Sequence, residues 1–354
     1  MRILHVIQEI AVGGAERVVL SLCDGAVAAG HEVAVAAAAG SLSHEFEGTT
    51  YELPLVERRL SRIPFAAWAL RRALHEFRPG IVHLHNPGMA AVAAVATRRG
   101  RSVPGLVSVH GMPEEDYRSA ARVLRLAGFP VVACGPGVAS ALENERAQVT
   151  ATIVNGVGPA PTAADRAAVC KEWGLPADRP LILCLGRLTP QKNHTLAISA
   201  LAQLPNVSLV VVGEGPLAGE LQRQASELGV ANRFVLAGVR TDARALIGAC
   251  DAVCLPSVWE GLPLVALEAL AAGKPLVATV GEWGIAELLS DGEDALLVPA
   301  NDPTALASAL ERVLSDANLA SRLAEGARRT AVLYSEEAMV TAYLDLYERL
   351  ARRR

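Results

Sequence analysis

The sequence predicts an α/β protein built from two doubly wound domains, each with its own parallel sheet. Three observations lead to this fold class. Short apolar segments of strand length alternate with helical segments from one end of the chain to the other. A Gly/Pro-rich stretch divides these apolar segments into two sets. The 354 residues are also enough for two domains of common size.

The expected strands are apolar along their whole length, which is typical of parallel strands covered by helices on both faces of the sheet. In the first set they span Arg2–Ile7, Glu32–Ala38, Ile81–Leu84, Leu106–Val109, Val131–Ala133 and Ala151–Val154. In the second set they span Leu181–Leu185, Val207–Val212, Arg233–Leu236, Ala252–Leu255, Leu276–Ala278 and Ala295–Val298. Each set is large enough for one doubly wound, Rossmann-like domain.

The boundary between the domains falls in the Gly/Pro-rich segment 155–164. We therefore expect an N-terminal domain at residues 1–160 and a C-terminal domain at residues 161–334. The last segment, 335–354, has the pattern of an amphipathic helix with acidic residues at its start and arginines at its end. Its apolar side consists of Met339, Tyr343, Leu346, Tyr347 and Leu350.

The composition narrows the class of protein. Apolar residues make up 51% of the chain and aromatic residues only 4%, so the core is expected to consist of Ala, Val and Leu. A net charge of -4 and a pI near 6.1 argue against a general nucleic-acid binder. The six cysteines form no C-x-x-C pair and are expected to be reduced core residues. No signal-peptide layout and no apolar run of about 18 residues is present, which predicts a cytoplasmic protein.

One stretch, 259–273, organises the predicted function. It is interpreted as a loop followed by a helix that starts at Pro263 and ends at Gly273. The helix is apolar on every face except for Glu268, and a buried carboxylate needs a partner. Glu260 comes just before the helix, where free amides favour an anion. If all eight steps between them were helical, the two carboxylates would lie about 12 Å apart. Two interpretations stay open here, namely contacts to two parts of one ligand, or a core helix whose Glu268 pairs with a structural Arg or Lys.

Two further candidate loops follow strands of the second set, where ligands bind to doubly wound sheets. Arg187 and Lys192 follow the first of these strands, and together they can hold a diphosphate through a guanidinium fork and a point charge. Gly186 in the same loop and Gly213 in the next allow a ligand to approach the backbone closely. Plain surface cations and ordinary turns remain the alternatives.

The first domain offers two more such loops. Gly13 and Gly14 follow its first strand and precede a helix, although the string is not G-x-G-x-x-G. His110 falls at the end of the strand Leu106–Val109, where a structural role is the alternative. His83 and His85 lie at the end of another strand and alternate onto one face. A metal site is the weaker interpretation of these two, since no carboxylate or Cys lies near them in the sequence.

These strings resemble the retaining GT-B glycosyltransferases of family 4, the glycosyl transferases group 1. The resemblance rests on P-S-V-W-E-G-L-P with Glu268 eight residues after Glu260, on G-R-L-x-x-x-K-N at 186–193, and on G-G-A-E-R at 13–17. It implies two Rossmann-like domains that face a cleft, and a terminal helix that returns to the first domain. It also implies that Glu260 contacts the donor sugar, that Glu268 contacts the ribose, and that His110 lies next to the transferred sugar.

The resemblance assigns each candidate residue a place in the site. As catalytic candidates it gives His110, Arg187, Lys192 and Glu260. As donor-binding candidates it gives Gly13, Gly14, Gly186, Gly213, Arg240, Gly261, Leu262, Leu264 and Glu268. Two departures from the family pattern are Gly158-Pro159 after the string Asn-Gly-Val, and Trp283 in a segment where the family usually has Gly-Gly.

The expected function is the retaining transfer of a sugar from a nucleotide-diphosphate-sugar to a hydroxyl of a glycan, a lipid-linked sugar or a natural product. The sequence has no D-x-D string, and Arg187 and Lys192 can offset the diphosphate charge, so we expect no cofactor and no required metal. The alternatives are a nucleotide-sugar epimerase of the same architecture and a non-catalytic sugar-nucleotide-binding protein.

Segment 57–101 suggests that the protein makes peripheral contact with the cytoplasmic face of an anionic membrane. It contains nine arginines against two glutamates, although the whole chain is acidic. Around Phe65 and Trp68 this segment has the pattern of a basic amphipathic helix. The alternatives are an ordinary surface helix with Trp68 in the core, and a soluble acceptor.

Overall fold

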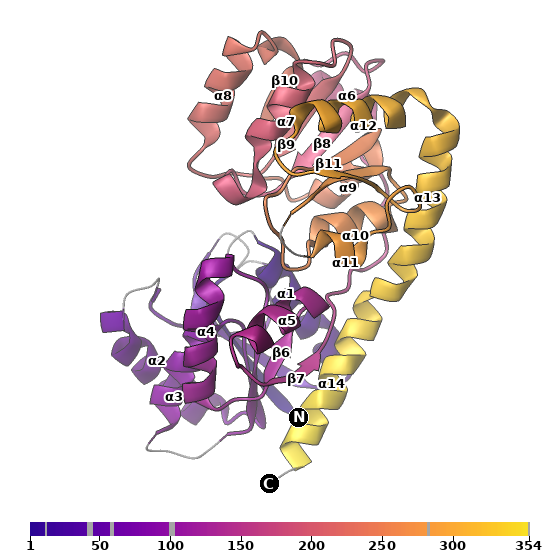
Figure 1. Cartoon of the computed structure of the whole chain (residues 1–354). Helices are drawn as coiled ribbons and strands as arrows, with labels where there is room; N and C mark the ends of the chain where they lie inside the picture. The colour runs from indigo at the N-terminus through magenta and orange to yellow at the C-terminus, as the bar shows by residue number, and fades with distance from the viewer. Residues whose placement is uncertain (11–12, 41–44, 57–59, 99–102, 282–283, 353–354) are drawn as a thin grey trace. The chain divides into compact units, whose positions relative to one another are not determined.

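The computed structural model describes residues 1–10, 13–40, 45–56, 60–98, 103–281 and 284–352. The chain divides into two compact units. Unit 1 comprises Met1–Gly156 together with Glu336–Arg354, and unit 2 comprises Val157–Ser335 (Figure 1). The units thus change at 156/157 and 335/336, where the sequence placed boundaries at 160/161 and 334/335.

Unit 1 contains a seven-stranded sheet in the order β3-β2-β1-β4-β5-β6-β7, in which every paired strand is parallel. The strands are β1 (Arg2–Glu9), β2 (Glu32–Ala38), β3 (Thr49–Glu52), β4 (Ile81–Leu84), β5 (Gly105–Val109), β6 (Val131–Ala133) and β7 (Val149–Thr152). The direction of chain progression reverses between β1 and β4, which makes this pair the switch point where doubly wound sheets bind ligands.

The sequence did not predict β3. Its residues, Thr-Thr-Tyr-Glu, are exposed or half-buried, because an edge strand pairs on one side only and needs no continuous apolar run. β7 is the other edge strand, and half-buried and exposed residues alternate along it. The inner strands β4 and β5 are buried at every position.

Six α-helices of the described chain cover this sheet. They are α1 (Gly14–Ala28), α2 (Ile63–Phe77), α3 (Pro87–Thr97), α4 (Glu114–Ala127), α5 (Pro136–Asn144) and α14 (Glu336–Arg352), with a 3-10 turn at Leu60–Arg62. α14 buries four of its five predicted apolar residues, Met339, Tyr343, Leu346 and Tyr347, and leaves Leu350 half-buried. It packs closely on α1, since a Cβ added at Gly25 would lie 2.5 Å from a Val340 methyl group.

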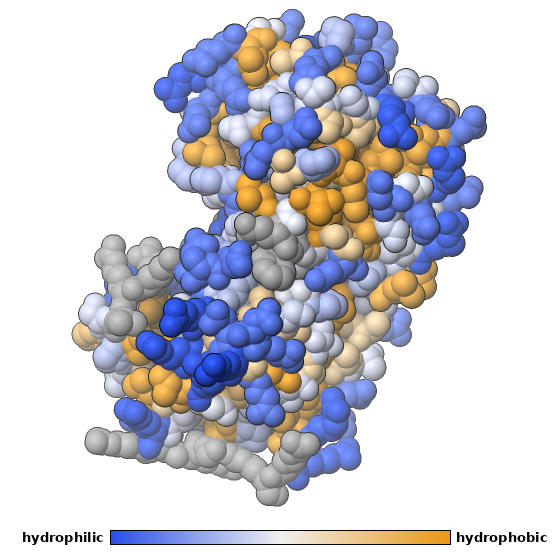
Figure 2. Space-filling view, in the orientation of Figure 1, coloured by the Kyte–Doolittle hydropathy of each residue, from blue (hydrophilic) through white to orange (hydrophobic). Residues whose placement is uncertain are grey.

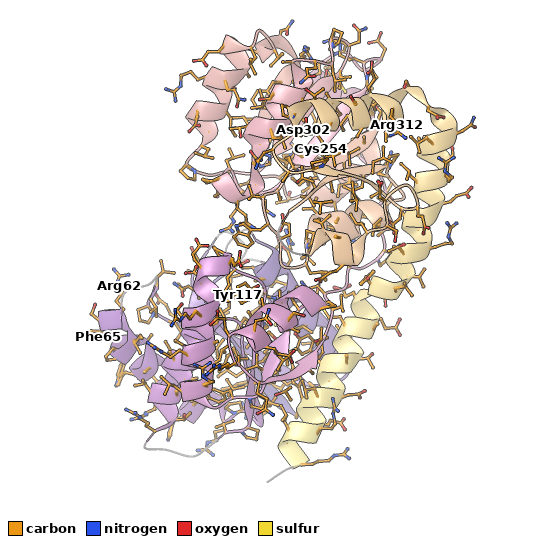
Figure 3. All side chains as sticks on the ribbon, viewed as in Figure 1. Arg62, Phe65, Tyr117, Cys254, Asp302 and Arg312 are labelled. Atoms are coloured by element: carbon orange, nitrogen blue, oxygen red, sulfur yellow. The ribbon has the colours of Figure 1, made fainter. Side chains whose placement is uncertain are left out.

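The outer faces of α2 and α4 are rich in arginine. Figure 2 shows strongly hydrophilic side chains over α4, on which Arg118, Arg122 and Arg125 are exposed. On α2, Phe65 and Trp68 are 70% and 69% exposed, and Figure 3 shows Phe65 pointing away from the ribbon. The alternative in which Trp68 faces the core is therefore wrong.

Unit 2 contains a six-stranded parallel sheet in the order β10-β9-β8-β11-β12-β13. The strands are β8 (Leu181–Leu185), β9 (Ser208–Val212), β10 (Phe234–Gly238), β11 (Ala252–Leu255), β12 (Leu276–Val280) and β13 (Leu296–Pro299). The switch point lies between β8 and β11. Both sheets confirm the predicted fold class.

In unit 2 the last two helices are longer than those that come before them in the sequence. The helices of this unit are α6 (Arg166–Glu172), α7 (His194–Leu201), α8 (Ala218–Glu227), α9 (Ala243–Ala249), α10 (Leu264–Ala271), α11 (Ile285–Leu288), α12 (Pro303–Ser315) and α13 (Ala317–Ala331). Three 3-10 turns lie at Pro190–Lys192, Ala231–Arg233 and Val332–Tyr334. The core is built mainly from Ala, Val, Leu and Ile, and all six cysteines are buried and free, as predicted.

The helix predicted after Glu260 is α10, and it ends as expected. Gly273 has a φ of 59°, the amide of Gly273 donates to the Leu270 carbonyl, and that of Lys274 donates to the Ala269 carbonyl. This is the Schellman arrangement that a glycine after the last helical turn permits. The start differs by one position, because Pro263 caps the helix in an extended conformation and is not its first residue.

Within the described ranges, no helix is both long enough and apolar enough to span a membrane.

Candidate active site

The catalytic candidates of unit 2 lie at the carboxyl ends of its central strands. Arg187 and Lys192 follow β8, Gly213 follows β9, and Glu260 follows β11. Because β9, β8 and β11 are neighbours in a parallel sheet, these loops share one edge. The loop that carries Lys192 and the loop that carries Glu260 flank the switch point.

Lys192 and Glu260 form an ion pair in which the ammonium Nζ lies 2.6 Å from the carboxylate Oε1. The side chains are 14% and 6% exposed. The hydroxyl of Ser257 donates to the same oxygen at 2.6 Å. One carboxylate oxygen is thus held by two donors. A lysine ammonium has three N–H groups, so its bond to Glu260 leaves donors for an anionic ligand.

Backbone contacts join the two loops beside this ion pair. The Val258 amide donates to the Gln191 carbonyl at 2.8 Å, and the Gln191 side-chain amide donates to the Trp259 carbonyl at 3.2 Å. Arg187 is exposed, and its guanidinium reaches the Gln191 side chain at 3.4 Å. The structure thus places a cation on the surface next to the buried ion pair.

Gly213 lies where the loop after β9 touches the loop after β8. Its φ is 146°, and a Cβ added there would lie 2.1 Å from the Gly186 carbonyl oxygen. A side chain at this position would force the two backbones apart. Gly186 lies against the side chain of Lys192, whose carbon atoms would be 3.2 Å from an added Cβ. The predicted glycines therefore let these loops pack closely.

Glu268 lies in α10 and is 16% exposed at its side chain. Its Oε1 is 3.6 Å from Nε of Arg244, which is a looser contact than that of Glu260 with Lys192. Arg244 also donates to the carbonyls of Gly158 and Pro159, the two residues that depart from the family pattern. The separation of about 12 Å between the two carboxylates was conditional on a continuous helix from Glu260 to Glu268, and that condition is not met because the helix begins at Leu264.

Arg240, predicted to contact the donor, is engaged by two carboxylates. It donates to both oxygens of Asp242 at 2.8 and 2.9 Å and to Glu172 at 2.5 Å. The guanidinium of Arg240 lowers the pKa of Asp242 below its usual value. Leu262 is buried beside Gly261, and Leu264 is half-buried at the first position of α10.

In unit 1, Gly13 and Gly14 begin α1. Gly13 caps the helix in an extended conformation, and its carbonyl accepts from the Arg17 amide. Arg17 in turn forms an ion pair with Glu45. Val12, which directly precedes the string G-G-A-E-R, lies outside the described residues, as do Glu282 and Trp283.

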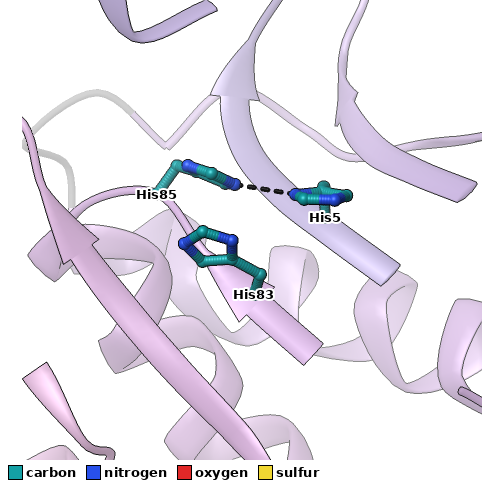
Figure 4. Close-up of side chains that lie close together, drawn as sticks. All are labelled: His5, His83 and His85. Atoms are coloured by element: carbon teal, nitrogen blue, oxygen red, sulfur yellow. Dashed lines mark hydrogen bonds between the residues drawn. The ribbon is translucent and has the colours of Figure 1, made fainter. Parts of the chain in front are cut away.

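His110 lies at the end of β5, as predicted, and contacts a second histidine. Its Nε2 is 3.2 Å from Nδ1 of His85, and Nε2 of His85 is 2.9 Å from Nδ1 of His5. Figure 4 shows the close approach of His85 and His5. Burial lowers the pKa of His110 to about 4 and that of His5 to about 3, and burial also holds the pKa of His85 well below its usual value.

His83 belongs to the same cluster but uses different partners. Its Nδ1 pairs with the Tyr347 hydroxyl at 2.6 Å and its Nε2 with the Ser108 hydroxyl at 2.7 Å. Ser108 also pairs with the Tyr343 hydroxyl at 2.8 Å. These bonds connect the sheet to α14, whose tyrosines are fully buried.

One nitrogen from each of His5, His83 and His85 lies within 4.8 Å of the others, a spacing that could suit a metal ion. Each of these rings is nevertheless engaged by hydrogen bonds. A divalent ion would bring two positive charges among neutral imidazoles, and that cluster supplies no carboxylate or thiolate to offset them. A hydrogen-bond network therefore explains the cluster better than a ligand set.

Family models match both halves of the chain. The model for "Glycosyltransferase Family 4" covers residues 12–157 and that for "Glycosyl transferases group 1" covers residues 165–330. A lipopolysaccharide core biosynthesis glycosyltransferase of Rhizobium meliloti, LpsE, is 33% identical over 65% of this chain and 71% of its own length. The chain belongs to the GT-B glycosyltransferases of family 4. It is therefore a glycosyltransferase.

Similarity to a second curated relative and to solved structures extends along nearly the whole chain. LpsD of Rhizobium meliloti, also a lipopolysaccharide core biosynthesis glycosyltransferase, is 29% identical over 99% of this chain and 98% of its own length. HepE of Anabaena, solved in complex with UDP and glucose, has a TM-score of 0.85 at 23% identity and 98% coverage of both chains. Sucrose-phosphate synthase of Thermosynechococcus elongatus has a TM-score of 0.86 at 22% identity over both full chains.

Several residues that complete the candidate sites of this glycosyltransferase were missed in the sequence. Ser257, Gln191 and Arg244 hold the predicted residues of unit 2. Ser257 stands three positions before Glu260, and that spacing was the one available signal. His5 completes the histidine cluster, and a polar residue inside the first apolar strand could have indicated it.

The buried histidines predict that this glycosyltransferase loses stability in mild acid. Unfolded, they titrate near pH 6.5, whereas in the folded chain their pKa values are lowered. As pH falls below about 6.5 the unfolded chain binds protons that the folded chain does not, so the free energy of unfolding decreases. Each histidine contributes up to about 1.4 kcal/mol per pH unit. Urea unfolding between pH 7.5 and 5 measures this slope.

Changing the exposed His75 to Gln should leave the slope as it is, while His83→Gln should reduce it. A free energy of unfolding that stays constant from pH 7.5 to 5 would contradict the neutral, buried state of the cluster.

Proposed function

We propose that the enzyme is a retaining, metal-independent glycosyltransferase whose donor diphosphate binds between the loops after β8 and β11. The observation that carries this proposal is the Lys192–Glu260 ion pair at the switch point, with Arg187 exposed in the same loop. The ammonium of Lys192 and the guanidinium of Arg187 would offset the charge that the diphosphate gains as it leaves. The free amides at the start of α10 add a further favourable site for phosphate oxygens.

The proposed reaction needs no metal, because two fixed cations take the part that a D-x-D-bound metal plays elsewhere. It needs no covalent nucleophile either. The bond from the anomeric carbon to the diphosphate oxygen breaks while the acceptor oxygen bonds to the same face. The acceptor proton passes to the leaving diphosphate. The configuration at the anomeric carbon is thereby retained.

The remaining assigned residues would orient the donor. Glu260 would contact the transferred sugar, Glu268 the ribose hydroxyls, and His110 a hydroxyl of the sugar. Family membership favours transfer over the two alternatives, an epimerase and a non-catalytic binding protein.

For the acceptor we propose a lipid-linked glycan. LpsE and LpsD, which this chain resembles over 65% and 99% of its length, are named for lipopolysaccharide core biosynthesis. Other relatives are named for D-inositol 3-phosphate and for phosphatidylinositol monomannoside, so phosphorylated and lipid acceptors recur among them. A soluble natural product is the second candidate, since a relative from Streptomyces kanamyceticus is named alpha-D-kanosaminyltransferase.

Incubating the enzyme with nucleotide sugars and truncated glycolipid acceptors tests stereochemistry and metal use together. We expect the product to keep the anomeric configuration of the donor, as read from the coupling constant of the anomeric proton by NMR. We expect EDTA to leave the rate unchanged. An inverted product would contradict the retaining mechanism, and a rate lost in EDTA and restored by Mg²⁺ or Mn²⁺ would contradict metal independence.

We further propose that the outer face of α2 contacts an anionic membrane and so brings the enzyme to a lipid-linked acceptor. Phe65 and Trp68 are exposed, three positions apart on one helix, and Arg72 is exposed beside them. Aromatic side chains enter the headgroup region while arginines meet anionic lipids. Arg58, Arg59, Arg99 and Arg101 of the predicted basic segment lie outside the described residues.

The membrane contact predicts binding to vesicles that contain anionic lipid and none to neutral vesicles, and added salt should weaken it. Replacing Phe65 and Trp68 with Ser should remove most binding in a flotation assay. The matched control is Val332→Ser with Leu333→Ser, which removes two equally exposed apolar side chains from unit 2. If neither pair alters binding, or the folded wild type does not float with anionic vesicles, α2 is not a membrane face.

A further inference from the structure

His110, His85 and His5 form a chain of imidazole rings across three neighbouring strands. β5, β4 and β1 lie side by side in the sheet of unit 1. His110 and His85 directly follow β5 and β4, and His5 lies in the middle of β1. The rings of His85 and His110 are nearly parallel at 12°, and those of His5 and His85 are inclined by 25°. Hydrogen-bond distances of 3.2 and 2.9 Å connect the three rings in sequence.

The three imidazole rings together hold a fixed number of N–H protons. A neutral imidazole has one N–H donor and one nitrogen acceptor. Three neutral rings therefore hold three N–H groups, and the two bonds between the rings use two of them. The third N–H must sit at one end of the chain, and an unpaired acceptor nitrogen must sit at the other. The ends are Nδ1 of His110 and Nε2 of His5, which are both buried and have no hydrogen-bond partner among the described residues.

The two ends have different surroundings. Nε2 of His5 lies in the core, where the residue is 0% exposed, and a buried N–H without an acceptor is rare in proteins. Nδ1 of His110 lies after the end of β5, in the loop region where doubly wound sheets bind ligands. A spare N–H on His110 can find an oxygen when the ligand is bound, whereas a spare N–H on His5 cannot.

We propose that His5 and His85 are positioning residues that keep the outer nitrogen of His110, Nδ1, protonated, so that it donates to a hydroxyl oxygen of the transferred sugar. The role toward the sugar rests on the proposed function. In this arrangement Nδ1 of His5 donates to His85, and Nδ1 of His85 donates to His110. His110 then stays neutral, which avoids a fixed positive charge near an anomeric carbon that itself becomes positive during transfer.

His83 supplies a matched control within the same cluster. Its ring is tilted by 33° against that of His85 at a centroid distance of 3.8 Å, but its two nitrogens bond to Tyr347 and Ser108 respectively. His83 therefore takes no part in the hydrogen bonds that connect His5, His85 and His110. Replacing His83 should therefore affect stability more than the tautomer of His110.

Two substitutions at one position separate the bonds of the chain. The amide of Asn lies near the position of Nδ1 of a histidine, and that of Gln near the position of Nε2. His85→Asn therefore retains a partner for His110 and loses that for His5, while His85→Gln does the reverse. His5→Phe removes the far end without touching His110.

The test is NMR of the full-length enzyme labelled with ¹⁵N in the histidine rings, with the signals of His110 assigned from a His110→Gln variant. In the wild type and in His83→Gln, we expect His110 as the neutral Nδ1–H tautomer. His85→Asn keeps a partner for His110 but loses the bond to His5, so it should shift the His110 signals in the same direction as His5→Phe. His85→Gln should give a mixture, and His5→Phe should shift the His110 signals toward the same mixture. A wild-type His110 protonated on Nε2, or His110 signals unchanged in both His85→Gln and His5→Phe, would overturn the proposal.

Steady-state kinetics separates this proposal from the proposed function. We expect His85→Gln to lower kcat about tenfold with little change in the KM for the donor, as for one lost hydrogen bond. If the tautomer of His110 changes but kcat does not, His110 does not contact the sugar. That result would overturn the proposed role of His110, but not the hydrogen-bonded chain of imidazole rings. One equivalent of tightly bound metal by mass spectrometry, lost in His83→Gln, would instead make the cluster a metal site and overturn the chain.

Discussion

Lys192 and Glu260 lie 68 positions apart in the sequence, yet their charged groups meet at 2.6 Å. The contact connects the loop after β8 to the loop after β11. These two strands flank the switch point of the unit 2 sheet. Because the Glu260 side chain is only 6% exposed, its charge requires a cation, and Lys192 supplies it. Gln191 and Arg187 lie in the same loop, and Ser257 and the start of α10 lie on the other side. The donor site proposed for this family 4 enzyme thus depends on one buried pair.

In unit 1 the buried polar groups also need partners, but these groups are neutral. The buried positions of its strands are apolar except at His5, His83 and Ser108, and each of these side chains bonds to another polar group. Two tyrosines of α14 complete the network, so the last helix of the chain takes part in the polar core of the first unit. Buried polar networks specify one arrangement of their members, because any other arrangement leaves donors or acceptors unpaired.

Periodicity and turn residues predicted the fold well. The limits of β2, β4, β6, β8 and β11 agree with the predicted segments to the residue, since buried parallel strands are continuous apolar runs. β3 was missed because an edge strand lacks that pattern. Motifs also singled out Lys192 and Glu260 as candidate site residues. They did not predict that the two side chains bond to each other, because spacing along the sequence does not give contacts between loops.

The roles of other residues needed tertiary structure for the same reason. Arg240 was predicted as a donor contact, and Asp242 and Glu172 hold its guanidinium. His83 and His85 were recognised as sharing one face, but His5 lies on a strand nearly 80 residues earlier and joins them only through the pairing of β1 with β4. Side chains brought together by crossover connections leave no local signal in the sequence.

The most direct measurement is a double-mutant cycle on Lys192→Met and Glu260→Gln, with unfolding free energy and nucleoside diphosphate affinity as readouts. Either single change leaves one partner of a buried pair alone and should cost roughly 3 kcal/mol of stability. The double variant should recover much of that loss, yet bind the diphosphate at least about tenfold more weakly, because the ammonium that meets the phosphate is gone. Additive losses of stability, or a double variant with wild-type affinity, would contradict the account.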